Sequence, residues 1–180
     1  MMWRERADSL KDKNYVAIAR YEFAAKAIPD HGFLIADAAC GMGYGTHMLH
    51  DISHDNHVVG MDCSQEALTY AAAHYPGPAY ILGDVSRQTF AGFDVLVCIN
   101  TLVNMIDPLI FLKNLAVPRL VIGSIVSPSS HYIEWHRHDF TPEQFESMLQ
   151  PQYRIISRFP QIKVYDTKED YLTLYCERVL

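Results

Sequence analysis

The sequence predicts an α/β fold, namely a three-layer sandwich with a mostly parallel seven-stranded sheet and a C-terminal antiparallel hairpin. From residue 33 to about residue 150, short apolar runs alternate with segments of helical periodicity. This alternation is typical of parallel strands that are joined by crossover helices. Near the C-terminus, residues 153–159 and 171–177 both alternate apolar with polar side chains in places, and no helical pattern lies between them. Two strands connected without a helix pair antiparallel, so these segments form the predicted hairpin.

The chain is expected to hold an N-terminal arm and one domain. Residues 1–14 are polar apart from Trp3, which favours a short arm. A helical pattern begins at Tyr15 and ends near Ile28, with apolar side chains at three- and four-residue steps. At 180 residues, the chain has the length of a single domain, which we place at 15–180.

The remaining elements follow in strict alternation. The expected parallel strands cover about 33–37, 57–62, 79–83, 93–99 and 118–125. The expected helices between and after them cover about 44–51, 64–74, 107–115 and 141–150. Ser64 is a plausible cap of the second of these helices. Thr141, with Pro142 at the first helical position and Gln144 behind it, is a strong start signal for the last.

The stretch DAACGMGYG, from Asp37 to Gly45, carries the most functional information. A strand that ends in a carboxylate and leads through a glycine loop into a helix is a typical cofactor cradle. Glycines permit positive φ and close approach of a ligand to the backbone, and the helix N-terminus presents free N–H groups. The glycines Gly41, Gly43 and Gly45 follow the pattern G-x-G-x-G, whereas a dinucleotide fingerprint has G-x-G-x-x-G.

Acidic residues also close the next two apolar runs. Asp62 ends the second predicted strand, at a solvent-facing position where nucleotide-binding sheets hold the two ribose hydroxyls. Asp84, followed by the apolar Val85, ends the third. A nicotinamide enzyme shares the first two acidic positions but has no particular need of the third, so Asp84 counts against that class of enzyme.

These features resemble motif I and the following strand ends of class I S-adenosylmethionine (AdoMet) methyltransferases. Two further segments resemble one subgroup of that family, which has R-Y-x-F-A before the glycine loop and E-Y-T-P-E-E-F after the fifth strand. Here they are Arg20-Tyr21-Glu22-Phe23-Ala24 and Asp139-Phe140-Thr141-Pro142-Glu143-Gln144-Phe145. The resemblance implies the Rossmann-like methyltransferase fold, S-adenosyl-L-methionine as the cofactor, and methyl transfer to an acceptor that is most simply a small molecule.

The resemblance also assigns a cofactor site, in which the glycine loop surrounds the methionine part and the sugar. Asp62 is expected on the ribose, Asp84 with the Val85 amide on adenine, and Asn100 at the methionine end. The complete expected set is Tyr21, Asp37, Gly41, Gly43, Gly45, Asp62, Asp84, Val85 and Asn100. Tyr21, from the helix before the loop, is expected to help close the pocket.

One departure from the family pattern concerns catalysis. After the fourth strand the family commonly has Glu, and then Glu-His, where this chain has Asn100 and Asn104. An asparagine cannot act as a base. The histidine-rich segment after the fifth strand offers three candidate bases instead, His131, His136 and His138, because ligands bind beyond the carboxyl ends of the strands. The spacing of ligand types there fits no standard metal site, so no metal ion is expected.

Composition sets the remaining expectations. With 21 acidic and 15 basic residues, the net charge of −6 disfavours a dedicated nucleic-acid binder. The chain opens on charged residues and has no apolar stretch of bilayer length, which favours a cytoplasmic protein without a membrane segment. Its four scattered cysteines indicate free thiols. The oligomeric state stays open.

Three alternative functions also stay open from the sequence. The chain could bind AdoMet without transferring its methyl group, as a regulator or as a partner's subunit. It could cleave AdoMet, or it could be a nicotinamide oxidoreductase on a similar sheet.

Overall fold

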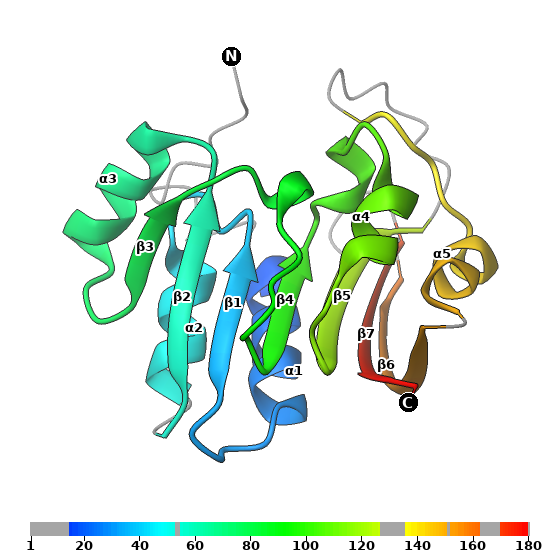
Figure 1. Ribbon diagram of the computed structural model, residues 1–180, viewed down its shortest axis with the longest axis horizontal. Coiled ribbons are helices and arrows are strands. Elements are labelled where there is room, and N and C mark those ends of the chain that lie inside the picture. The colour runs from blue at the N-terminus through cyan, green and yellow to red at the C-terminus, as the bar shows by residue number, and fades with distance from the viewer. Residues whose placement is uncertain (1–14, 53–54, 127–135, 151, 163–169, 180) are drawn as a thin grey trace.

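A computed structural model describes residues 15–52, 55–126, 136–150, 152–162 and 170–179, and it contains the predicted seven-stranded sheet (Figure 1). The strands are β1 (Leu34–Ala38), β2 (His57–Asp62), β3 (Ala79–Leu82), β4 (Val95–Ile99), β5 (Arg119–Ile125), β6 (Tyr153–Gln161) and β7 (Tyr171–Arg178). The helices are α1 (Tyr15–Ala27), α2 (Tyr44–Ile52), α3 (Gln65–His74), α4 (Pro108–Asn114) and α5 (Pro142–Leu149). Two short 3-10 turns that the sequence did not predict, η2 (Val85–Arg87) and η3 (Leu102–Asn104), follow β3 and β4.

The strand order is β3-β2-β1-β4-β5-β7-β6. β1 to β5 pair in parallel, and β7 enters the sheet antiparallel between β5 and β6. The predicted C-terminal hairpin is therefore confirmed, and it closes one edge of the sheet. The chain order reverses between β1 and β4, so the crevice that forms at such a switch point lies beyond their carboxyl ends.

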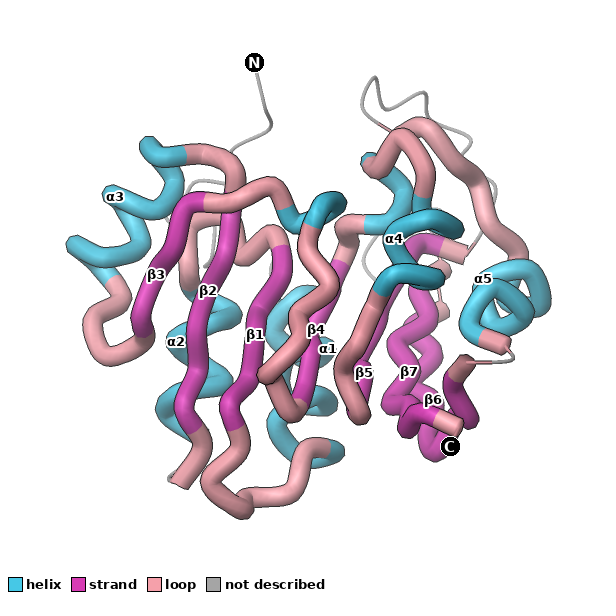
Figure 2. The backbone as a smooth tube through the Cα atoms, viewed as in Figure 1, coloured by secondary structure: helices cyan, strands magenta, loops and turns pink. Residues whose placement is uncertain are grey.

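Two apolar cores lie on opposite faces of the sheet, because successive side chains of a strand point to opposite sides. β4 is buried along its whole length, with Leu96 and Cys98 in one core and Val95 and Val97 in the other. α1 and α2 cover one face of the sheet and α4 and α5 the other, while α3 packs beside β2 and β3 (Figures 1 and 2). This arrangement confirms the three-layer sandwich.

The helix start signals are confirmed in detail. The Ser64 hydroxyl accepts a hydrogen bond from the Ala67 N–H at the start of α3. At α5, the Thr141 hydroxyl accepts from the Gln144 N–H while the Gln144 side chain accepts from the Thr141 N–H. This reciprocal pair is a capping box, worth on the order of 1 kcal/mol.

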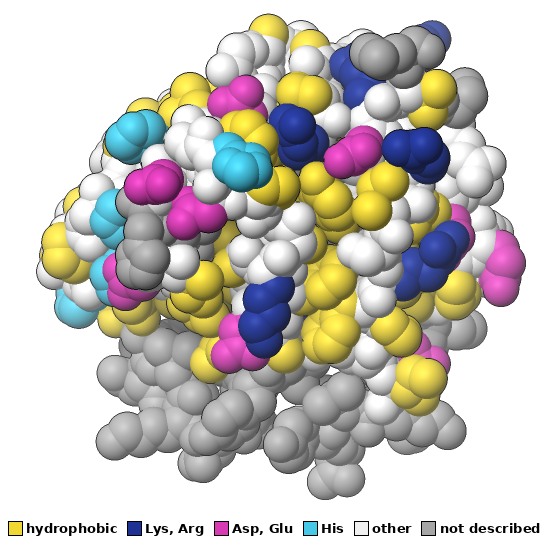
Figure 3. All heavy atoms as spheres, turned by 90° about the horizontal axis from the view of Figure 1, so that it is seen from below, with side chains coloured by type: hydrophobic (Ala, Val, Ile, Leu, Met, Phe, Trp, Pro, Cys, Tyr) yellow, Lys and Arg dark blue, Asp and Glu magenta, His cyan; other side chains and the backbone are white. Residues whose placement is uncertain are grey.

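The described surface is mixed in charge and contains no bilayer-length helix. In the face turned toward the viewer in Figure 3, acidic and basic side chains are interspersed. Among the described helices, none combines the length and apolar character that crossing a membrane requires.

All four cysteines are free as predicted, and only Cys63 is exposed.

Candidate cofactor site

The loop between β1 and α2 adopts a left-handed backbone at every second residue. Ala39, Gly41 and Gly43 have φ values of 59°, 55° and 86°. The alternation thus begins at Ala39, an alanine that sequence analysis did not single out because it carries no glycine signal. A side chain at Gly43 would collide with Ala71 and Tyr80, whereas the Cβ direction at Gly41 opens into free space. The loop therefore leaves its backbone accessible at Gly41.

Gly45 lies inside α2, as its second residue. A Cβ at this position would run into the ring of Tyr21, so the close approach of α1 and α2 explains the glycine. The predicted contact of Gly45 with a cofactor stays a prediction, and the structure supplies a packing reason for the residue in addition.

Asp37 lies one residue before the end of β1 and is fully buried beneath the loop. The Thr46 hydroxyl donates to its Oδ2 at 2.7 Å, and the Tyr21 hydroxyl donates to its Oδ1 at 3.3 Å. Burial raises the pKa of Asp37 to about 7, although both hydrogen bonds act in the opposite direction. Tyr21 and Asp37 thus form one buried network with Thr46, a residue that sequence analysis missed.

The Asp62 side chain holds the glycine loop in place. Its Oδ2 accepts from the Gly41 N–H and its Oδ1 from the Ser64 N–H, both at 2.9 Å. The expectation of a solvent-facing residue is wrong, because Asp62 is only 8% exposed. Each carboxylate oxygen has further acceptor capacity, so these bonds leave room for hydroxyl donors.

Asp84 and Val85 form the start of η2. Asp84 Oδ1 accepts from the Ser86 N–H and hydroxyl, and its Oδ2 makes an exposed ion pair with Arg87 at 3.1 Å. The hydrogen bond from Ser86 is the main cause that lowers the pKa of Asp84. The Gly83 N–H donates to the Asp62 carbonyl at 2.9 Å, which places the two predicted adenosine-binding strand ends side by side.

Asn100 occupies the turn directly after β4, with a left-handed φ of 58°. Its N–H donates to the Gly123 carbonyl, and its own carbonyl accepts from the Asn104 side chain at 3.3 Å. The Oδ1 atom is buried and has no hydrogen-bond partner in the described part of the chain. An unpaired buried acceptor is costly, on the order of 1–3 kcal/mol, and a donor from outside the described residues would remove that cost.

Two of the three predicted catalytic histidines lie beside this turn, while His131 lies outside the described residues. The Arg137 N–H donates to the Val103 carbonyl at 2.7 Å, and His138 Nε2 lies 2.9 Å from the Met105 carbonyl. Residues 136–138 therefore run along η3. Because a carbonyl only accepts, His138 Nε2 must carry the proton, and Nδ1 is the nitrogen left for a ligand. Within the described ranges, no group of three or more metal-ligating side chains is assembled.

The strand order and the left-handed glycine loop are those of a Rossmann-like methyltransferase fold. Residues 35–116 match the family model described as a methyltransferase domain, a span that covers β1 through α4. The chain therefore has the Rossmann-like methyltransferase fold, and over these residues it is similar to methyltransferases that use S-adenosyl-L-methionine. No sequence among the curated proteins matches the chain.

Solved structures with the same fold include two methyltransferases crystallised with S-adenosylhomocysteine. Magnesium protoporphyrin IX methyltransferase (ChlM) from Synechocystis PCC 6803 is 14% identical, with a TM-score of 0.75 over 99% of this chain and 90% of that one. The N-methyltransferase NodS from Bradyrhizobium japonicum WM9 is 15% identical, with a TM-score of 0.74 over 98% and 94%. The [4+2]-cyclase SpnF is 14% identical, with a TM-score of 0.74 over 91% and 82%. At these identities the likeness establishes the fold.

Proposed function

We propose that this methyltransferase moves the methyl group of AdoMet to a small-molecule acceptor by in-line displacement. The observation that carries the proposal is the buried, unpaired Oδ1 of Asn100. It lies at the carboxyl edge of the sheet, where the alternating left-handed loop leaves Gly41 open. A positively charged amino group, such as that of the cofactor's methionine part, supplies the donor that this oxygen lacks.

The other predicted cofactor residues are assigned roles that suit their chemistry. The backbone of Gly41 and Gly43 lies along the methionine part, and Asp62 accepts from the ribose hydroxyls. Asp84 accepts from the exocyclic amine of adenine, and the Val85 N–H reaches a ring nitrogen. Asp37, Tyr21 and Gly45 contribute from beneath, since their described contacts hold the loop and α2 together.

Catalysis then depends mainly on alignment. When bound, AdoMet supplies a methyl group already activated on a sulfonium centre, and displacement by the acceptor leaves the electrons of the broken C–S bond on sulfur. The chain's task is to hold donor and acceptor in line and to exclude water. Where the acceptor must lose a proton, His136, His138 or His131 takes it.

Calorimetric titration tests the cofactor. AdoMet and S-adenosylhomocysteine should both bind, and NAD should not. A tighter complex with NAD than with either adenosyl compound would overturn the proposal. A screen of cell extracts with methyl-labelled AdoMet then identifies the acceptor as a labelled small molecule, and labelled protein or nucleic acid would contradict the proposed acceptor class.

A second candidate is a protein that binds AdoMet without transferring methyl. Asn100 and Asn104, which cannot act as bases, favour it, and a [4+2]-cyclase has the same fold. Under this alternative, AdoMet binds but no labelled acceptor forms in any extract. The appearance of methylthioadenosine together with homoserine or its lactone, without a labelled acceptor, would indicate cleavage of AdoMet.

A further inference from the structure

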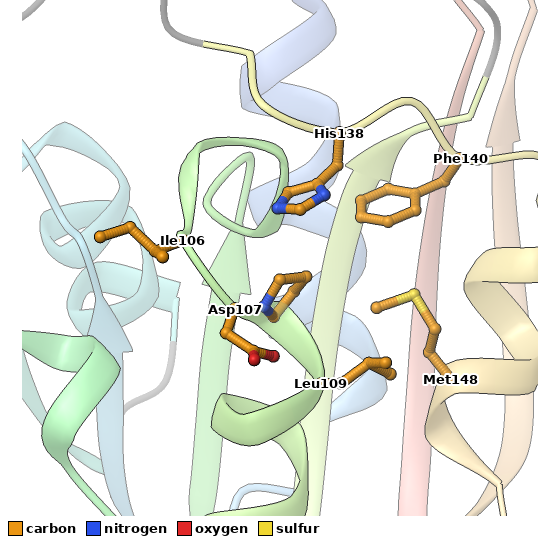
Figure 4. Close-up of a pocket in the computed structure, with 7 residues that line it drawn as sticks. Ile106, Asp107, Leu109, His138, Phe140 and Met148 are labelled. Carbon is orange, nitrogen blue, oxygen red and sulfur yellow. The ribbon is translucent and has the colours of Figure 1, made fainter.

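A groove of about 300 Å³ lies between the start of α4 and the segment that leads into α5. Figure 4 labels six of the residues that line it, namely Ile106, Asp107, Leu109, His138, Phe140 and Met148, and also draws the seventh, Pro108. Ligand sites for small molecules begin at about this volume. The groove is on the α4–α5 face of the sheet, separate from the glycine loop.

The rim of the groove exposes large apolar side chains. Ile106 is 85% exposed and Leu109 is 58% exposed, while Phe140 is buried at its back. Exposed apolar side chains that border a hollow are typical of binding surfaces rather than of ordinary protein surface. The groove is therefore suited to a hydrocarbon chain or an aromatic ring.

The polar groups of the groove restrict its ligand further. His138 Nε2 is engaged by the Met105 carbonyl, so Nδ1 is the histidine atom that can accept from a ligand. Asp107 Oδ1 accepts from the Ile110 N–H and caps α4, which leaves a negative charge at the rim. The described residues that line the groove include no Lys or Arg. A neutral or cationic ligand with one hydroxyl or N–H donor suits this lining, and an anion does not.

A short series of contacts links the groove to the turn at Asn100, directly after β4. The Asn104 side chain donates to the Asn100 carbonyl at 3.3 Å. The next residue, Met105, holds His138, and Ile106 then enters the groove wall. Residues 104–106 thus connect the groove wall to the turn that carries the unpaired Asn100 oxygen.

We propose that this groove binds the apolar part of the methyl acceptor, which rests on the proposed methyl transfer. The acceptor belongs to small, neutral or cationic molecules with an apolar ring or short hydrocarbon chain and one hydrogen-bond donor. The donor bonds to His138 Nδ1, and the apolar part lies against Leu109, Phe140 and Met148.

Nuclear magnetic resonance titration of the full chain with 4-butylphenol tests the groove itself. Leu109→Glu should weaken this probe by about tenfold, because a charge replaces apolar contact area. Ile110→Glu is the matched control, since Ile110 is 55% exposed on the same helix but does not line the groove. It should change the affinity by less than about twofold. The proposal also requires 4-butylphenol to bind more tightly than 4-butylanisole, which lacks the donor, and than the anion 4-butylbenzoate.

Equal effects of the two substitutions, or a preference for the anion, would overturn the groove proposal. AdoMet affinity, measured on the same variants, distinguishes failure of the groove proposal from failure of the proposed function. If AdoMet binds and 4-butylphenol does not, the groove proposal fails and the proposed function stands. If 4-butylphenol binds with the expected pattern and AdoMet does not bind, methyl transfer fails, and with it the identification of the ligand as an acceptor. In the methyl-label screen, Leu109→Glu should lose labelling of an apolar acceptor that Ile110→Glu retains.

Discussion

The carboxylate of Asp62, at the end of β2, accepts a hydrogen bond from the backbone N–H of Gly41 at 2.9 Å. This bond fixes the glycine loop to the neighbouring strand end, and the same side chain also receives the Ser64 N–H at the start of α3. Asp62 therefore shapes the site as well as being the proposed ribose ligand. The two tasks are distinguished by measuring AdoMet binding and stability separately.

Asp62→Ala should weaken AdoMet binding by about 1.5–3 kcal/mol, the usual range for losing hydrogen bonds to a charged group. It should also lower the free energy of unfolding by about 1–3 kcal/mol, because two backbone N–H groups lose their acceptor. Asp62→Asn keeps an acceptor oxygen for one of the two N–H groups but turns its NH2 group toward the other, so it should retain only one of the two bonds. Calorimetry and urea denaturation measure the two quantities. Unchanged AdoMet affinity in the alanine variant would exclude the ribose role.

Asn100→Gly should weaken AdoMet binding by about 1–3 kcal/mol, since it removes the unpaired acceptor. Glycine adopts the left-handed backbone of this turn without strain, so the folded state should keep its stability. Asn100→Asp retains an acceptor and should bind AdoMet at least as well as the wild type. If the glycine variant binds AdoMet normally, the Asn100 oxygen does not face the cofactor.

Without AdoMet, the protein's free energy of unfolding should fall as the pH rises from about 4 to about 7, because of Asp37. Burial raises its folded-state pKa from 3.8 to about 7, so in this range the folded state holds a proton that the unfolded state has lost. The stabilising effect of that proton is complete below the unfolded pKa and is lost as the pH passes the folded pKa. Each pKa unit corresponds to about 1.4 kcal/mol, which gives an effect of a few kcal/mol.

Urea denaturation at pH 5 and pH 7.5 measures the Asp37 effect. Asp37→Asn keeps an acceptor oxygen for one of the two hydroxyls and turns an NH2 group toward the other, but it has no titratable group, so its stability should fall less over this interval. Parallel curves for the wild type and the variant would contradict the buried, titrating carboxyl.

Gly41→Ala should mainly weaken AdoMet binding, whereas Gly45→Ala should mainly destabilise the fold. At Gly41 the added methyl meets no atom, and the left-handed backbone costs about 1 kcal/mol, so the fold survives while the methyl occupies the proposed cofactor space. At Gly45 the methyl collides with Tyr21 and should destabilise the fold by about 1–3 kcal/mol. Thermal unfolding and AdoMet titration of both variants distinguish the two roles. An AdoMet affinity of Gly41→Ala equal to that of the wild type would place the cofactor elsewhere.

Alanine at His131, His136 or His138 should leave AdoMet affinity within about 1 kcal/mol of the wild type, and at least one should lower turnover about a hundredfold. His138→Ala should in addition destabilise the fold by about 1 kcal/mol, because the ring also holds the Met105 carbonyl. Binding and turnover are compared for each variant. Normal turnover in all three would show that alignment alone carries the reaction, and joint loss of affinity and turnover would place the segment in the cofactor site.

The sequence by itself determined the fold class and the position of the cofactor loop. Asp37, Asp62 and Asp84 each stand at or beside the end of an apolar run, and parallel strands bring such ends to one edge of the sheet. The caps Ser64 and Thr141 were predictable because they act on N–H groups a few residues away. Local periodicity and short-range hydrogen bonding depend on residues that are close together in the sequence, and these features could therefore be predicted.

Only the tertiary structure decided what each of these side chains does. The Asp62–Gly41 bond spans 21 positions, and the His138–Met105 bond spans 33. No sequence pattern indicated that Asp37 is enclosed by Tyr21 and Thr46. None indicated that the ring of Tyr21 leaves no room for a side chain at Gly45, or that a groove opens between α4 and α5. Such features depend on which surfaces of distant elements meet, and packing geometry in three dimensions settles that, whereas local propensity does not.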